Sequence, residues 1–481
     1  MTLLLNHRND IPILTVPKGR LTSARATELG EAMEQLAIQR TGVVLLDLTQ
    51  VSATDAGALA VLYEVVSRSR ATSALFGAKG KLARQFGQFG LDKVLPLAPS
   101  ESTALALPEI RARQMSGLRT VILSSDHSSA MRGFHGLAPI ALLDVLGAPL
   151  LDRIMADLTA CGIRDLVLTP GHGGDRLIER YRHHAGRNLF FLNQGYRDGD
   201  HWVARTQGAQ AVLARLDQDH AALDRDTLVL DGGMLSGLNH GRLLEIHRHS
   251  GAQLTLAVST TGKTPLPGMG MAEDGRLVPH ATPDKAGLRP VTWSGACILN
   301  RDALRSGLDL KGDMVDLIRR LLRDGALIAT LSDSAPSFSA ATPRGYFDLL
   351  AAILDGHTPW QPIGTRADGH WLGPDADLPR RTRIEGACYF SKGARVAPQA
   401  VLKGRCVVGR NVVIEDKTVL SDTVLLEGAR LSSGAWAQSS ILSRDWSLSH
   451  LSPLPQIPAP ETLVPAAAHA ESQIPLTRRL V

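Results

Sequence analysis

The sequence predicts an α/β multidomain protein that ends in a left-handed parallel β-helix. Up to residue 355, apolar runs typical of buried strands alternate with segments whose apolar residues recur at helical spacing. From residue 384 the apolar period becomes six, which neither a helix nor an ordinary strand gives. We expect an α/β domain over 1–107, a linker over 108–117, a larger α/β domain over 118–355, a linker over 356–375, the β-helix over 376–445 and a Pro/Ala-rich tail over 446–481.

Composition excludes several classes of function. The 481 residues carry 52 basic and 47 acidic side chains, a net charge of +5, and only 4% are aromatic, so nucleic-acid binding is not expected. The four cysteines lie far apart without a CxxC pair, which argues against a zinc site and for a reducing compartment. The N-terminus lacks the pattern of a signal peptide, and no apolar run approaches the roughly 20 residues of a membrane span. We therefore expect a cytoplasmic protein.

The first domain mixes strands and helices. The run GVVLLDLTQV is a buried strand, because it is continuously apolar, and a helix with a cap at Ser23 precedes it. The other expected elements are a strand and turn in IPILTVPKGRL, a turn into a helix in TDAGALAVLYEVVSRSR, a strand in SALFGA and a short helix in KLARQFGQFGLDKVLPL.

This order resembles the STAS domain of anti-sigma-factor antagonists, through GRL at 19–21, LLDLTQVSATDAGALAVL at 45–62 and FGLDKVLPL at 89–97. In that family a serine just before the glycine of the second helix is phosphorylated to switch partner binding. Here Ala56 occupies that position, after Thr54 and Asp55. Asp55 either caps the helix or presents a constant acidic group to a partner. Thr54, Asp55 and Ala56 are the regulatory or docking candidates.

The middle domain alternates strands with helices. TVILS, DLVLT, TLVLDG and QLTLAVST are strand-like, and PLLDRIMADLTACG has apolar residues on one helical face. This alternation predicts a Rossmann-like domain with a mostly parallel sheet, whose ligands bind at the carboxyl ends of the strands. His240, His247 and His249 fall in one helix here; their spacing does not suit a zinc pair, and we expect them at the solvated surface.

The six-residue period indicates hexapeptide repeats, in which each turn of a β-helix buries one aliphatic side chain per face. The positions are Ile384, Phe390, Val396, Leu402, Val408, Ile414, Leu420 and Leu426. Smaller residues precede them by two positions.

Over roughly 118–445 the chain resembles the sugar-1-phosphate nucleotidyltransferases, mannose-1-phosphate guanylyltransferases in particular. The matching segments include GAPLLDRIMADLTACGIRDLVL, TLVLDG and SGACILN, followed by the β-helix. The resemblance implies a nucleoside triphosphate, a sugar phosphate and Mg²⁺, with attack of the sugar phosphate on the α-phosphorus and loss of pyrophosphate.

The residues that the family uses for catalysis are replaced here. The loop arginine falls on Ala130, the loop lysine on Ile140, and the two metal-binding aspartates on Gly233 and Ser339. The resemblance therefore implies no catalytic residue, no metal and no cofactor, with Mg²⁺ expected only if the site is active. Ligand-binding candidates are Thr206, Gly208, Lys285, Gly295, Asp231 and Trp202.

Three functions remain open. The first is a catalytically degenerate regulator or scaffold of bacterial surface or exopolysaccharide production, with protein partners bound through the STAS-like domain and oligomers formed through the β-helix. The second is an active enzyme with a rearranged site that uses Asp126, Asp144 or Asp231 for metal and Arg132 for phosphate. The third is a sensor that binds a nucleotide sugar or sugar phosphate without turnover.

Overall fold

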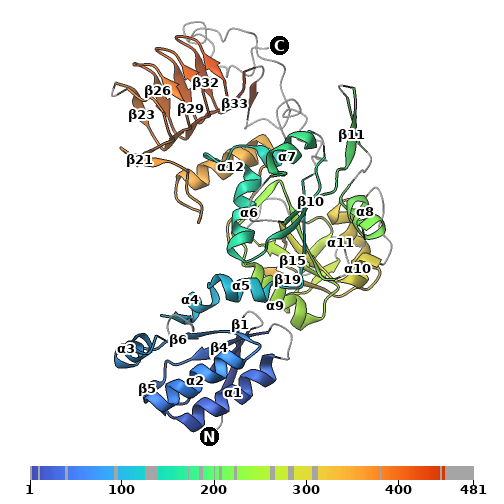
Figure 1. Ribbon diagram of the computed structural model, residues 1–481. Coiled ribbons are helices and arrows are strands. Elements are labelled where there is room, and N and C mark those ends of the chain that lie inside the picture. Colours follow the sequence, from blue (N-terminus) through green and yellow to red (C-terminus); the bar gives the residue numbers. More distant parts are fainter. Residues whose placement is uncertain are drawn as a thin grey trace.

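The computed structural model shows three bodies that follow one another along the chain (Figure 1). It describes residues 3–8, 11–37, 42–90, 96–124, 139–171, 173–183, 188–199, 201–204, 208–220, 225–260, 266–279, 287–305, 312–379, 381–444 and 447–449. No helix within these ranges is long and apolar enough to cross a bilayer.

The first body is a five-stranded sheet with helices on both faces. Its order is β1 (Leu4–Arg8), β2 (Ile11–Thr15), β4 (Val43–Asp47), β6 (Thr72–Phe76), β7 (Leu97–Ala98), and only β1 runs antiparallel to its neighbour. Alternate residues of β4 enter opposite cores, as the pleat requires. One core lies under α1 (Ser23–Ala37), α2 (Ala56–Arg68) and α3 (Gly80–Gln88), the other under α4 (Glu101–Leu105) and α5 (Pro108–Gln114). A short ladder of β3 (Gly19–Leu21) and β5 (Val51–Thr54) completes it.

Two details differ from the sequence-based expectation for this body. The N-terminal residues form a strand, β1, which the sequence pattern did not predict. The hydroxyl that caps α1 belongs to Thr22, one residue before Ser23, since its Oγ1 accepts from Arg25 N at 3.4 Å.

The expected linker over 108–117 contains α5. Ile110 of this helix is fully buried in the core of the first body, and Met115 just after it packs in the core of the second. The guanidinium of Arg111 donates from Nη1 to the carbonyl of Ala160 at 2.9 Å. Helix α5 therefore contacts both bodies.

The second body has a seven-stranded sheet that is mostly parallel, as the sequence predicts. Its order is β10 (Asn188–Phe191), β9 (Asp165–Leu168), β8 (Arg119–Leu123), β13 (Thr227–Asp231), β18 (Thr292–Leu299), β15 (Leu254–Ser259), β19 (Ile328–Ser332), and only β18 is antiparallel to its neighbours. One face carries α6 (Leu150–Ala160), α7 (Gly174–Tyr181), α9 (His240–Ser250) and α12 (Pro343–Leu354); the other carries α8 (Ala209–His220), α10 (Arg301–Arg305) and α11 (Met314–Arg323).

Short elements decorate this sheet. They are the 3-10 turn η3 (Ile140–Leu142) and the antiparallel pairs β11 (Gly195–Asp198) with β12 (His201–Ala204), β14 (Met234–Ser236) with β20 (Ser337–Ser339), and β16 (Met269–Met271) with β17 (Leu277–Pro279).

The third body stacks short strands in three sheets that are parallel apart from two end strands, β21 (Thr365–Ala367) and β34 (Ser447–Ser449). One sheet holds β22 (His370–Leu372), β24 (Cys388–Phe390), β27 (Cys406–Val408), β30 (Val424–Leu425) and β33 (Ser440–Leu442) between those ends. The others hold β23 (Arg383–Glu385), β26 (Val401–Lys403), β29 (Val419–Ser421) and β32 (Trp436–Gln438), and β25 (Arg395–Val396), β28 (Val413–Ile414) and β31 (Arg430–Leu431). Strands recurring in three parallel sheets are compatible with the expected β-helix.

The period of this body shortens by one residue near its end. Leu402 pairs with Leu420, eighteen positions on, which is three hexapeptides. Val408 pairs instead with Leu425, seventeen positions on, and Leu425 is buried whereas Leu426 is half-buried. The expectation that Leu426 continues the buried row was therefore wrong. The row resumes at a spacing of seventeen as far as Leu442.

One sheet of the third body packs onto the second body through its outward side chains. Tyr389, Val407, Val424 and Ile441 each stand at one step of that sheet and are buried in the core that contains α12. The guanidinium of Arg405 forms an ion pair with Asp355 at 3.0 Å, just after α12. The outward apolar residue that recurs at each step of this sheet thus determines which face of the third body packs against the second body.

Candidate functional site

A pocket of about 380 Å³, which we call the strand-end pocket, opens where β8 and β13 end. The two strands pair in parallel and finish opposite one another at Leu123 and Asp231, the edge of the sheet where ligands of such folds bind. None of the described residues that line it is an arginine or a lysine. The lining is Leu123, Ser124, Ile140, Ala141, Gly208, Ala209, Asp231, Gly232, Gly233, Trp293, Asp313, Met314, Val315 and Ala341.

The positions of the family's two metal-binding aspartates lie side by side. Ser339 pairs with Met234 between β20 and β14, and the N–H of Ala340 donates to the carbonyl of Gly233 at 2.8 Å. The fold thus brings together the positions that the sequence singled out, but they carry a hydrogen atom and a hydroxymethyl group. Neither can ligate Mg²⁺ as a carboxylate does.

Gly233 also faces Ile140, which stands at the position of the family's lysine. A Cβ on Gly233 would lie 3.5 Å from Cγ2 of Ile140 and 3.2 Å from Oδ1 of Asp231. The segment that carries Ile140 forms η3 beside the pocket. Where the family resemblance implies a cation, the pocket has an aliphatic wall.

Asp231 is the carboxylate at the end of β13. Its Oδ1 accepts from the N–H of Gly233 at 2.8 Å, and desolvation raises the pKa of its carboxyl above the ordinary value despite that bond. The hydrogen bond ties the side chain to the turn after β13. Asp231 is one of the predicted ligand-binding candidates, and it does line the pocket.

Two glycines among the predicted ligand-binding candidates have backbone conformations that favour glycine. Gly208 precedes α8 with a φ of +100°, which favours glycine, and it lines the pocket as predicted. Gly295, another predicted candidate, is not among the described lining residues; its φ is +81°, and a Cβ there would lie 2.8 Å from Cβ of Met234 in β14.

Two lining residues were not singled out from the sequence. Trp293 is the second residue of β18 and donates from Nε1 to the carbonyl of Ala296 at 3.1 Å. Asp313 caps α11 by accepting from Asp316 N at 2.9 Å. The capping pattern of Asp313 was readable, but its place at the pocket depends on residues far away in the chain.

Several candidates lie outside the described residues. They are Ala130, Thr206 and Lys285, together with Asp126 and Arg132 of the alternative enzyme hypothesis. The backbone of Trp202 belongs to β12, opposite Arg197, and its side chain is not described.

Asp144 does not line the described part of the pocket. Its Oδ1 accepts from Gly147 N at 2.8 Å, its carbonyl accepts from the hydroxyl of Tyr346, and desolvation raises the pKa of its carboxyl. Tyr389 of the third body contributes to the same surroundings. Asp144 therefore belongs to the junction between the second and third bodies, and the suggestion that it could bind metal was wrong for this conformation. Among the described residues, no group of three metal-binding side chains occurs.

The docking candidates of the first body lie at the start of α2. Asp55 is its N-cap, with Oδ1 accepting from Ala58 N at 2.8 Å, and Arg20 forms an ion pair with it at 3.3 Å. Ala56 is exposed. Thr54 is buried, and its hydroxyl donates to the carbonyl of Leu21 at 3.3 Å. The capping role expected for Asp55 is confirmed.

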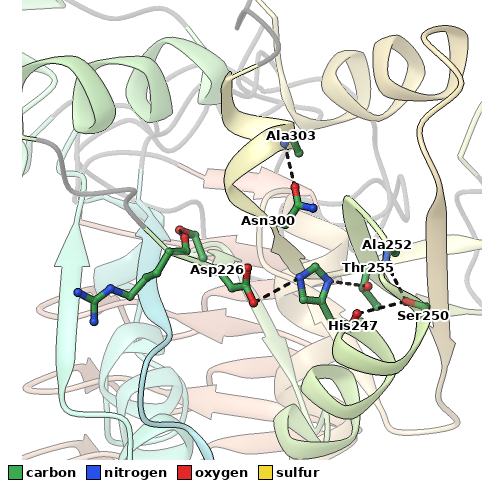
Figure 2. Close-up of polar contacts among 9 residues, drawn as sticks. Asp226, His247, Ser250, Ala252, Thr255, Asn300 and Ala303 are labelled. Atoms are coloured by element: carbon green, nitrogen blue, oxygen red, sulfur yellow. Dashed lines mark hydrogen bonds and ion pairs between the residues drawn. The ribbon is translucent and has the colours of Figure 1, made fainter. Parts of the chain in front are cut away.

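The histidines of α9 depart from the expectation of a solvated surface. His247 is buried, with Nδ1 2.9 Å from Oγ1 of Thr255 and Nε2 3.9 Å from Oδ2 of Asp226 (Figure 2). This array has the order of a catalytic triad, but Thr255 is fully buried, so no substrate can reach its hydroxyl. The nearby imidazole of His247 lowers the pKa of the Asp226 carboxyl. The array pins α9 to β15. His240 is also buried, whereas His249 is exposed.

Comparison with known proteins agrees with both resemblances. Residues 3–104 match the family model of the STAS domain. The mannose-1-phosphate guanylyltransferase of Mycobacterium tuberculosis is 23% identical over 319 residues, which cover 65% of this chain and 81% of that protein. The bifunctional protein GlmU of Heliobacterium modesticaldum is 22% identical over 334 residues, or 63% of this chain and 69% of that protein. The chain thus joins an N-terminal STAS domain to a part that is similar to sugar nucleotidyltransferases.

Proposed function

We propose that this protein is a catalytically degenerate nucleotidyltransferase-like protein that acts as a regulator or scaffold, with its STAS domain as the docking module for a partner protein. The observation that carries the proposal is the pair Gly233 and Ser339. These two positions lie on neighbouring paired segments, one step out of register, and neither has a carboxylate.

The electrostatics of the pocket support the same conclusion. Transfer of a nucleotidyl group depends on positive charge held against the phosphates, and loss of one such preorganised group commonly costs several kcal/mol of transition-state stabilisation. The described lining contains the carboxylates of Asp231 and Asp313 and no cationic side chain. Both carboxylates are already bonded to backbone N–H groups. A polyphosphate would therefore meet repulsion here.

The STAS domain supplies the surface for a partner. STAS domains commonly mediate protein interactions, and here the serine position of the family switch is Ala56, so partner binding would not be controlled by phosphorylation of that residue. Two large apolar side chains of the same domain, Tyr63 of α2 and Phe89 after α3, are exposed by 42% and 55%. They suit a protein partner.

The biosynthetic setting follows from the relatives. Guanylylation of mannose 1-phosphate is named for the relative from Mycobacterium tuberculosis. Nucleotide sugars feed polysaccharide assembly, so we place this protein in the regulation of bacterial surface or exopolysaccharide production. Self-association, or pairing with an active homologue, would use the hexapeptide-repeat body.

A second candidate function is sensing of a nucleotide sugar without turnover. It is favoured by the pocket itself, which keeps about 380 Å³ of space, an aromatic wall at Trp293 and the left-handed glycine at Gly208. Binding here would need no metal.

One experiment separates these functions. The purified chain is heated with and without Mg²⁺ in the presence of nucleoside triphosphates, sugar 1-phosphates and nucleotide sugars, and pyrophosphate is assayed in the same samples. The degenerate scaffold predicts no shift in Tm and no pyrophosphate. A nucleotide sugar that raises Tm without turnover establishes the sensor. Pyrophosphate that requires Mg²⁺ would show an active enzyme and overturn the proposal.

A further inference from the structure

A second and larger cavity, of about 860 Å³, lies between the STAS domain and the middle body. Its walls come from β1, α4 and α5 on one side, and from the end of α6, the segment 236–241 and the pair Pro359–Trp360 on the other. Figure 1 shows α4 and α5 at this junction, between the first sheet and the helices of the middle body. We call this cavity the interdomain cleft. It has the volume of a small-molecule site.

A buried polar atom in the wall has no hydrogen-bond partner among the residues that the structure describes. His240 is only 7% exposed, and its Nδ1 makes no hydrogen bond within the part of the chain that the structure describes. Leaving a buried polar atom in this state is unfavourable, so native proteins retain few of them. Beside it, the amide of Gln114 lies within about 3 Å of where a Cβ on Gly241 would stand. The imidazole lines the cleft, and its Nδ1 is itself shielded from solvent.

A carboxylate faces the same space. Asp157 accepts at Oδ2 from Nε1 of Trp360 at 3.0 Å, a bond between residues 203 positions apart. Desolvation raises the pKa of the Asp157 carboxyl, and its bond to Trp360 opposes that rise. A half-buried carboxylate with few competing waters is a strong acceptor for ligand hydroxyl groups.

The charges of the cleft are balanced. Arg8 and Glu101 pair at 3.6 Å across the STAS side. Arg111 donates from Nη1 to the carbonyl of Ala160 and from Nε to that of Leu105. With both cations engaged and a carboxylate at Asp157, the cleft does not favour a phosphate group. It does favour a neutral molecule rich in hydroxyl groups.

We propose that the interdomain cleft binds a saccharide, whose hydroxyl groups bond the carboxylate of Asp157 while its ring packs against the imidazole of His240. Both domains supply walls, so the occupied cleft holds the STAS domain in one position relative to the middle body. Binding of the sugar would thereby control which surface of the STAS domain is accessible to its partner. The control of a partner rests on the proposed docking function of the STAS domain, whereas saccharide binding in the cleft stands or falls independently of it and of catalysis in the strand-end pocket.

Cys161 provides a direct readout. It lines the cleft, and of the four cysteines, all of which the structure describes, it is the one that is not buried. Burial raises the pKa of its thiol, so alkylation by a maleimide is followed at mildly alkaline pH. The probes are D-mannose, D-glucose, maltose, their 1-phosphates where these exist, and inorganic phosphate. A free saccharide at ten times its Kd is expected to slow labelling about tenfold by mass action.

Matched variants assign the protection to the cleft. His240→Gln and Asp157→Asn each remove one proposed contact, and Asp157→Asn keeps an oxygen for Trp360, so it carries the test if His240→Gln folds poorly. Trp293→Ala alters the strand-end pocket instead. We expect protection to be lost in the first two variants and kept in the third. Three results would overturn the proposal: protection that survives both cleft variants, protection abolished by Trp293→Ala, and protection by phosphate compounds alone or by no saccharide.

Discussion

At the scale of single residues, Asp231 is a desolvated carboxylate that lies close to the positions of the family's metal-binding aspartates. It sits where the family resemblance implies chemistry, but its Oδ1 is bonded to Gly233 N and desolvation raises the pKa of its carboxyl. A raised pKa means that the charged form is disfavoured by folding. Its negative charge therefore lowers stability at neutral pH, and this cost fades as pH falls through the folded-state pKa.

Asp231→Asn should accordingly stabilise the protein. The amide oxygen can still accept from Gly233, and the buried charge is gone, so Tm should rise by about 2 °C at pH 7 and by less at acid pH. Differential scanning fluorimetry across pH measures this. Asp313→Asn is the control, since that carboxylate caps a helix N-terminus, where negative charge is favourable, and its removal should lower Tm. A lower Tm for Asp231→Asn would contradict the desolvation cost that we assign to this carboxylate.

The pKa of His240 predicts a pH dependence of stability opposite in sign to that expected from Asp231. Burial lowers its pKa to about 4 from the usual 6.5. Between these values the unfolded chain binds a proton that the folded chain does not, so stability falls as pH drops from 6.5 toward 4. The loss is on the order of 3 kcal/mol.

Denaturation by urea at about pH 7 and about pH 4.5 tests this, since the two values bracket most of the interval over which the imidazole titrates. His240→Gln should lose less stability than wild type over that range, because glutamine does not titrate. His249→Gln, at an exposed position of the same helix, should behave like wild type. Equal losses in wild type and His240→Gln would refute the buried neutral imidazole.

At the scale of elements, the register of the third body is the sharpest difference between sequence and structure. The period of six correctly predicts the buried row from Phe390 to Leu420, but it cannot register a coil of seventeen residues. Val408 stacks on Leu425, so the row of large buried residues moves one position toward the N-terminus.

Leu425→Ala should therefore destabilise this body by about 2–4 kcal/mol, whereas Leu426→Ala should cost clearly less. Urea denaturation followed by far-ultraviolet circular dichroism compares the two. Leu402→Ala, in an earlier coil with similar burial, provides the reference. A larger loss for Leu426→Ala would restore the unbroken period of six.

What the sequence could predict depends on how local the signal is. Strand runs and helical spacing are local, and they predict the sheets and the helix N-cap at Asp55. The replaced residues at Ile140 and Gly233 could be found because flanking motifs align them. The burial of His240 and the Asp157–Trp360 bond could not, because they depend on segments from three parts of the chain that meet only after folding.

At the scale of the whole molecule, helix α5 couples the STAS domain to the middle body. A Cβ on Gly162, whose φ is +80°, would lie 2.3 Å from Cα of Ala112 in α5. The absence of a side chain there allows the turn after α6 to approach the helix backbone closely. The third body packs against the middle body through Tyr389, which is buried in the core that contains α12.

Gly162→Ala should push α5 away from the middle body. We expect a lower Tm and a larger radius of gyration in small-angle scattering, with secondary structure unchanged. Gly117→Ala also alters a glycine of positive φ, +90°, but its Cβ would meet nothing within 4 Å, so it controls for backbone strain alone. An unchanged radius of gyration for Gly162→Ala would argue against close docking through α5.

The central claim is that the middle body no longer transfers nucleotidyl groups. Single-turnover pyrophosphate release tests it most directly, with the protein in excess over nucleoside triphosphate, a sugar 1-phosphate and Mg²⁺, because slow product release cannot then hide the reaction. The guanylyltransferase from Mycobacterium tuberculosis serves as the positive control. We predict no pyrophosphate above buffer. Release that requires Mg²⁺ and the sugar phosphate would contradict this claim and show that the site has been rebuilt from other residues.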